Sequence, residues 1–259
     1  RLAVVAGQLD TALDAVDHAL QIQPDMSAAI ILKAPVLVRQ ERNADATLLL
    51  KDATDKHPEN TDLLFAYGRM LLSGEDLEGA QQQFHKVVKI NPEHADGLYS
   101  LALLELETRK FRAGEKHLRQ LLELNQHMQN AYYYLGYAAL EQGKDKQALD
   151  WSLKVESGDY WKQAQLRAAG IMVKQGDIQR MQDYMRELHQ KNPQMAIQLY
   201  IIEGQTLTEA GLHQQAFDLY GKALEYSPDE EDLLDSRSMA YVKLGKLDVS
   251  ESTMRRILE

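Results

Sequence analysis

Proline recurs at a fixed interval along this sequence. Pro24, Pro58 and Pro92 lie 34 residues apart, and Pro193 and Pro228 return in nearly the same phase. A period of this length is typical of repeat proteins, in which each unit buries its apolar faces against its neighbours. The period therefore predicts a chain of stacked units rather than a fold with one central core.

Two further markers share this period. Glycine stands about 17 residues before the proline position, at Gly7, Gly143, Gly176, Gly211 and Gly245. A small residue follows about five positions after the glycine position, at Ala12, Ala46, Ala80, Gly114, Ala148 and Ala216. These markers divide each unit into two segments, each of a length that suits one helix.

The apolar pattern between the markers is helical. Residues 63–72 are apolar on nearly every side, as expected for a helix that is buried on two sides. The next segment carries a single apolar stripe with helical spacing, at Ala80, Phe84, Val87 and Val88. Glycine and proline supply only 15 and 6 of the 259 residues, which also favours helix. We predict about fifteen helices of roughly 11–16 residues and no strand.

Two features depart from ideal helix composition. Gly68, Gly136 and Gly204 fall in the middle of first helices, where each costs about 1 kcal/mol relative to alanine. Their small size would let the two helices of a unit approach closely. Pro35 falls inside a helix predicted over residues 27–40, where its ring removes a hydrogen bond to the carbonyl four residues earlier. We expect a kink or a break at this point.

A helix-turn-helix unit of 34 residues with these markers resembles the tetratricopeptide repeat family. Residues 132–144, with the sequence YYYLGYAALEQGK, are close to the family's ideal pattern. The resemblance covers the whole chain as about 7.5 repeats. The weakest are the second and the sixth, in which Glu41 and Met181 fill the glycine and small-residue positions. The resemblance implies an all-α fold, a right-handed α-solenoid of antiparallel helix pairs, forming a single domain over residues 1–259.

Charge and hydropathy exclude several classes of function. The chain has 29 lysine and arginine residues against 39 aspartate and glutamate residues, a net charge of −10. This balance argues against nucleic acid or an anionic membrane surface as the main partner, because both require clusters of cations. The longest apolar run, residues 28–32, is far too short to span a membrane.

The sequence also lacks the motifs of catalysis and of cofactor binding. It has no cysteine, no glycine-rich phosphate loop and no pair of histidines four residues apart. We interpret the eight scattered histidines as solvated surface residues. We therefore predict that the chain is not an enzyme and needs no metal, nucleotide or covalent cofactor.

The remaining candidate is a binding surface. In the tetratricopeptide family the first helices line a concave face, and residues about 10, 6 and 3 positions before the turn marker point into it. In the second to fifth repeats these are Ile31, Pro35, Val38, Phe65, Arg69, Leu72, Tyr99, Leu103, Leu106, Tyr133, Tyr137 and Leu140. In the later repeats they are Leu166, Gly170, Val173, Ile201, Gln205, Thr208, Asp235, Met239 and Val242. The middle of this face is apolar and aromatic, which is typical of interaction sites.

Six of these residues form the candidate site for a protein partner: Phe65, Arg69, Tyr99, Leu103, Tyr133 and Tyr137. Packing alone is the alternative, because tyrosine at the first of these positions is common in the family and partly packs against the neighbouring helix. The family's lysine and asparagine clamp for the C-terminal carboxylates of chaperones is not expected, since tyrosine, leucine and valine fill those positions.

A finer resemblance rests on residues 155–169 (VESGDYWKQAQLRAA) and 196–203 (AIQLYIIE), with the missing proline between units. These segments look like bacterial tetratricopeptide lipoproteins of the LbcA type. That resemblance implies a periplasmic adaptor, tethered to the outer membrane, that delivers cell-wall hydrolases to a carboxyl-terminal processing protease. The chain begins at Arg1 without an anchor cysteine and stops within an apolar-periodic stretch, so we expect a fragment of a longer protein.

Three functional hypotheses follow. The first is a non-catalytic scaffold or adaptor that binds protein partners, such as a protease and its substrates, in its concave groove. The second is a structural module that forms homo-oligomers. The third is a regulatory domain of a larger enzyme or secretion channel. The mass of the particle in solution separates the first two.

Overall fold

The computed structural model describes residues 9–245. These residues form fourteen α-helices and one short 3-10 helix, and no strand occurs among them. The all-α prediction is therefore confirmed. The marker Gly7 and the apolar-periodic stretch over residues 246–259 lie outside the described residues.

The chain divides into two compact units, residues 1–131 and 132–259. The first unit contains α2 (Leu9–Ile22), α3 (Ser27–Arg39), α4 (Asn43–Lys56), α5 (Thr61–Ser73), α6 (Leu77–Ile90), α7 (Ala95–Glu107) and α8 (Phe111–Glu123). The division falls within α9 (Met128–Glu141). The second unit contains α10 (Asp145–Ser152), α11 (Trp161–Lys174), α12 (Ile178–Lys191), η1 (Pro193–Met195), α13 (Ala196–Glu209), α14 (His213–Tyr226) and α15 (Glu231–Lys243). One domain over residues 1–259 stays a prediction.

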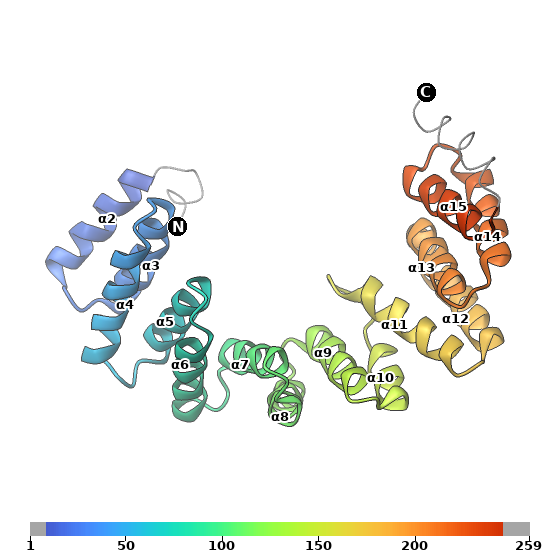
Figure 1. The fold of residues 1–259 in the computed structure, drawn as a ribbon. Coiled ribbons are helices and arrows are strands. Elements are labelled where there is room, and N and C mark those ends of the chain that lie inside the picture. Colours follow the sequence, from blue (N-terminus) through green and yellow to red (C-terminus); the bar gives the residue numbers. More distant parts are fainter. Residues whose placement is uncertain (1–8, 246–259) are drawn as a thin grey trace. The chain divides into compact units, whose positions relative to one another are not determined.

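Within each unit, consecutive helices pack as antiparallel neighbours (Figure 1). In the first unit α3 pairs with α4, α5 with α6 and α7 with α8, and each pair also contacts the next. In the second unit α13 pairs with α14, which packs in turn against α15. The fold is an all-α repeat solenoid, as the period of the sequence predicts.

The small-residue marker is a buried position in the described repeats. The described residues at this position are all buried: Ala46, Ala80, Gly114, Ala148, Met181 and Ala216. Met181 is 0% exposed even though it is the largest of them, so the sixth repeat accommodates a longer side chain. The side chain of Ala12 lies outside the described part of the chain.

The glycine marker is the residue that ends each first helix in a left-handed conformation. Gly143, Gly176, Gly211 and Gly245 have φ between 70° and 80°. The three repeats without glycine adopt the same conformation, with φ of 62° at Glu41, 64° at Glu75 and 58° at Arg109. The following N–H closes the turn on the helix, as from Asp76 to the Leu71 carbonyl at 3.0 Å. The register therefore determines this conformation, even where the residue type does not favour it.

The mid-helix glycines allow the close approach that the sequence predicts. A methyl group at Gly68 of α5 would lie 2.6 Å from Cε1 of Phe84 on α6. A methyl group at Gly204 of α13 would overlap the ring of Tyr220 on α14. Phe84 and Tyr220 are 0% and 1% exposed. In these two repeats an aromatic ring of the second helix occupies the space that glycine leaves on the first.

Two local predictions meet a different outcome in the structure. Helix α3 is continuous through Pro35, so the predicted break is absent, while the alternative of a kink there stays a prediction. The Pro35 ring is exposed, which lets one helix hydrogen bond be lost without displacing the core. Helix α10 has only 8 residues, fewer than the predicted minimum, and the chain then leaves the helix before Trp161 begins α11. Trp161 is 5% exposed and fills the space at this junction, where the repeat proline is missing.

Replacing Glu75 with glycine should raise the free energy of unfolding by about 0.5–1 kcal/mol, because a side chain in the left-handed region is strained. The reverse change at an equivalent position, Gly211→Ala, should lower it by a similar amount. Urea unfolding of both variants measures the effect. Unchanged or reduced stability of Glu75→Gly would contradict the account of this turn.

Replacing Gly204 with alanine should destabilise the protein by about 1–3 kcal/mol, since the overlap with Tyr220 outweighs the helix propensity of alanine. The matched control is Gly170→Ala in α11, where no neighbouring atom lies within 4 Å of the added methyl group. That variant should gain up to about 1 kcal/mol. If both variants gained stability, the close approach at Gly204 would not be a constraint on the fold.

Candidate protein-binding surfaces

The first unit has a solvent-open hollow of about 340 Å³ between α3 and α5. Four of the residues that line it, Ile31, Pro35, Val38 and Arg69, were predicted from the repeat to share one face. They come from two successive repeats. The structure therefore brings inner-face positions of neighbouring first helices together, as the register predicts.

The hollow combines an apolar floor with a cationic rim. Ala34 and Leu50 are 4% and 1% exposed and form part of the floor, where the small alanine side chain leaves depth. Arg39 and Arg69 both line the hollow, and no acidic residue does. The Arg69 side chain is exposed and forms no ion pair with any of residues 9–245. In a chain of net charge −10, Arg69 places a positive charge at this hollow.

Two of the predicted aromatic anchors in this unit are half-buried and already packed. The Phe65 ring contacts Phe84 and His94, with ring centroids 5.6 Å and 5.2 Å away. The Tyr99 ring stacks on His127 at 5.0 Å, with the ring planes 9° apart. His127 is held in turn by Asp96, with Nε2 and Oδ1 2.9 Å apart. These rings are therefore held in position by their neighbours, and each residue keeps part of its surface exposed.

The aliphatic positions of the predicted face differ in exposure. Leu103 is half-buried, as an inner-face residue should be. Leu106 and Ile201, however, are only 3% and 4% exposed, so they belong to the core and the prediction for them was wrong. A methyl group at Gly114 would lie 2.8 Å from Cδ2 of Leu106, which shows that Leu106 turns toward the second helix.

In the second unit, Tyr133 belongs to a cluster of aromatic side chains. Its ring stacks on Tyr160 at 4.3 Å with a 9° angle, and its edge meets Tyr134 at 5.0 Å. The Tyr134 hydroxyl donates to the Tyr160 hydroxyl at 2.8 Å. The guanidinium of Arg167 lies 4.5 Å from the Tyr133 ring centroid. These contacts make Tyr133 largely a packing residue.

Arg167 is the residue that sequence analysis missed. Its Nη1 donates to the Tyr133 carbonyl at 2.9 Å, exactly one repeat earlier in the chain. Burial lowers the pKa of Arg167, and the nearby Tyr133 and Tyr137 oppose this shift. Tyr137, by contrast, forms no ring stack or side-chain hydrogen bond among the described residues. It is half-buried, and it has none of the ring contacts that hold Tyr133, the other predicted anchor in this unit.

A second hollow, of about 410 Å³, lies between α11 and α13. Gly170 and Val173, two predicted inner-face residues, line it together with Lys174 and Glu209. Lys174 and Glu209 carry opposite charges, so the residues that line this hollow have no net charge. This hollow therefore discriminates less between ligands of different charge than the hollow of the first unit does.

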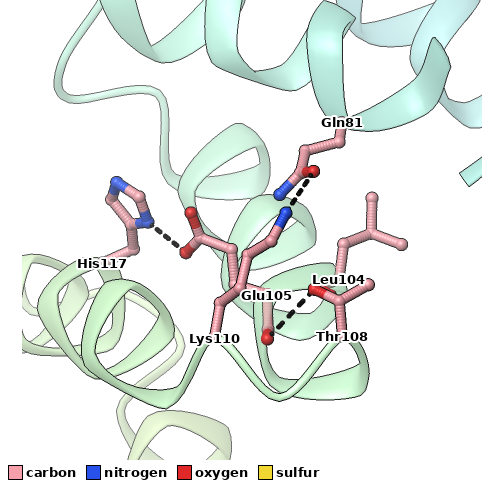
Figure 2. Close-up of polar contacts among 6 residues, drawn as sticks. All are labelled: Gln81, Leu104, Glu105, Thr108, Lys110 and His117. Atoms are coloured by element: carbon pink, nitrogen blue, oxygen red, sulfur yellow. Dashed lines mark hydrogen bonds and ion pairs between the residues drawn. The ribbon is translucent and has the colours of Figure 1, made fainter. Parts of the chain in front are cut away.

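One histidine forms a buried pair with a carboxylate, shown in Figure 2. Nδ1 of His117 on α8 lies 2.7 Å from Oε2 of Glu105 on α7, and their side chains are 12% and 3% exposed. Lys110 donates to Gln81 at 3.1 Å beside this pair, linking the start of α8 to α6. The reading of the histidines as solvated surface residues was wrong for His117, which ties two helices together.

Two further kinds of site do not occur among the described residues. No group of three or more histidine, aspartate or glutamate side chains among residues 9–245 is placed to hold a metal ion. No helix in this part of the chain has the length and hydropathy that crossing a membrane requires.

Comparison with known families identifies the repeats in the middle of the chain. Residues 37–104 and 99–164 match models of the tetratricopeptide repeat. Residues 37–164 are therefore built of tetratricopeptide repeats, a fold that serves as a protein-protein interaction scaffold.

A relative from Pseudomonas aeruginosa, named TPR repeat-containing protein PA4667, is 35% identical over 248 residues. The match covers 93% of this chain but 42% of the relative. The chain thus spans less than half the length of this curated relative.

Several solved structures share the fold. PilF from Pseudomonas aeruginosa matches with a TM-score of 0.59 at 17% identity, over 74% of this chain and 87% of that one. MamA matches with a TM-score of 0.57 at 16% identity, over 67% and 96%. YrrB, described as a TPR protein with an unusual peptide-binding site, matches with a TM-score of 0.50 at 16% identity, over 73% and 97%. At these identities the likeness shows the fold alone.

Tyr133→Ala should lower the free energy of unfolding by about 2–4 kcal/mol, because it removes the stack on Tyr160 and the support of Arg167. Tyr137→Ala should cost at least about 1 kcal/mol less, since fewer contacts are lost. Guanidinium unfolding of both variants makes the comparison. Equal losses would mean that the two tyrosines are packed alike.

Proposed function

We propose that this chain is a non-catalytic scaffold that binds a protein partner through the inner face of its first helices. The observation that carries the proposal is the hollow between α3 and α5, where inner-face positions of two repeats meet around Arg69, which is exposed and forms no ion pair within residues 9–245. Arginine is enriched in binding hot spots, and exposed apolar patches mark interaction sites. The peptide-binding site ascribed to YrrB supports this use of the fold.

The six candidate residues take two roles in this proposal. Arg69, Leu103 and Tyr137 contact the partner directly, since Arg69 is exposed and Leu103 and Tyr137 are only half-buried. Phe65, Tyr99 and Tyr133 present ring edges that their own packing holds in place. A surface that is already ordered loses little conformational entropy on binding, which favours affinity.

The finer proposal is an adaptor of the LbcA type. In it, the chain joins a carboxyl-terminal processing protease to cell-wall hydrolases, as part of a periplasmic lipoprotein tethered to the outer membrane. The supporting observations are the sequence segments 155–169 and 196–203 and the 35% identity to a repeat protein of Pseudomonas aeruginosa. An adaptor needs two surfaces, and each unit of the chain carries its own hollow.

Mixing the purified chain with the protease and a hydrolase of the same cell tests this proposal. Size-exclusion chromatography with light scattering should show the chain bound to the protease, and a larger particle when the hydrolase is added. A particle with the mass of several copies of this chain alone would favour the self-assembly hypothesis. Absence of any complex with either protein would contradict the adaptor.

Tyr137→Ala should weaken the complex with the protease by about 2 kcal/mol or more, roughly thirtyfold, while the chain stays folded. Lys146→Ala, an exposed change on the second helix of the same repeat, should leave the affinity unchanged. Isothermal titration calorimetry measures both variants. If Tyr137→Ala binds within twofold of the parent chain, the inner face of this repeat is not the contact surface.

A further inference from the structure

We propose that the hollow between α3 and α5 binds an acidic, apolar segment of a partner protein. In this proposal a carboxylate of the segment pairs with Arg69, an adjacent apolar side chain sits on the floor, and a backbone N–H reaches the Ile31 carbonyl. The inference rests on the proposed scaffold function and names the ligand class of one of its sites. It does not depend on the identity of the protease.

The floor selects an apolar side chain. Leu50 and Ala34 are nearly fully buried there, and Ala34 and Ala66 are small enough to leave a depression between the two helices. A volume of about 340 Å³ lies at the low end of the range for small-molecule pockets, so it suits one or two side chains. Burying such a group removes apolar surface from water on both sides of the contact.

The rim selects a negative charge. Arg69 lines the hollow, and none of the residues that line it is acidic, although the chain as a whole has a net charge of −10. The hydroxyl of Ser73, which also lines the hollow, donates to the Met70 carbonyl at 2.8 Å. The guanidinium of Arg69 has no ion pair within residues 9–245 and can bind a carboxylate through two hydrogen bonds.

Pro35 adds a third, directional element. Proline has no N–H, so the Ile31 carbonyl four residues earlier lacks its usual helix donor. Ile31 and Pro35 both line the hollow. A segment lying in the hollow can supply the missing donor from its own backbone. The otherwise unfavourable proline in the middle of α3 thereby gains a function.

Selection of random twelve-residue peptides displayed on phage, with the full chain as bait, tests the ligand class. We expect the enriched peptides to carry an aspartate or glutamate within two residues of a large apolar residue. The best peptide is then synthesised with a fluorophore and titrated by fluorescence anisotropy. Selection that enriches no peptide, or peptides without acidic residues, would overturn the proposal.

Variants of the chain locate the binding. Arg69→Ala should weaken binding of the peptide at least tenfold. On the parent chain, replacing the acidic residue of the peptide with its amide should weaken binding by a similar factor. On Arg69→Ala, the same replacement should weaken binding little further. Arg180→Ala, an exposed arginine on α12, is the charge-matched control and should bind within twofold. Ala66→Leu, which fills the hollow without changing charge, should also weaken binding. An affinity of Arg69→Ala within twofold of the parent would overturn the proposal.

Pro35→Ala tests the carbonyl separately. Alanine restores the helix donor to Ile31, so this variant should be more stable and should bind the peptide at least threefold more weakly. Equal affinity would overturn the role of the Ile31 carbonyl.

The outcomes of these experiments also separate the two proposals. If the protease binds Arg69→Ala normally and no peptide binds the parent chain, the proposed ligand class is wrong but the scaffold function stands. If the parent chain binds acidic peptides but no protease, the adaptor is wrong and the ligand class stands.

Discussion

The fold depends on how closely the two helices of a repeat can approach. A short helix pair cannot bury all of its apolar surface by itself. The two helices of a pair therefore pack against each other, and the pair packs against its neighbour. Gly68 and Gly204 allow the two helices of their pairs to pack closely, because the rings of Phe84 and Tyr220 occupy the space next to them. Buried alanines at the marker position of the second helices complete this packing. With both of these sides packed, the inner face of each first helix is the surface that we propose for a partner.

This separation of roles explains the mixed behaviour of the aromatic residues on the inner face. The Tyr99 ring stacks on His127, and the Tyr133 ring stacks on Tyr160. His127 and Tyr160 each stand directly before the next first helix. Such contacts link neighbouring repeats and fix the rings at the same time. Packing and binding are therefore not exclusive at these positions. Arg69 and Tyr137, which lack comparable stacks, are the positions where the binding contribution should dominate.

The repeat period predicted most of the fold, because register alone determines which positions meet. The positions of the small-residue marker that the period gave are buried. The structure adds that the left-handed turn also occurs at Glu41, Glu75 and Arg109, which stand at the glycine position without being glycine. The period could not predict that Leu106 and Ile201 are buried, since their exposure depends on the rotation of each helix. Nor could it predict the Glu105–His117 pair or the contact of Arg167 with Tyr133, because both depend on side-chain reach between helices. Sequence thus predicted which positions share a face of the repeats better than it predicted the contacts that these residues make.

The claim that the inner face binds while the second helices seal the core can be measured directly. Deuterium exchange of the chain alone and in complex with the carboxyl-terminal processing protease reports on each helix separately. The account predicts slower exchange on binding in the first helices α5, α7 and α9, with no change in the second helices α6, α8 and α10. Protection confined to the second helices would contradict it.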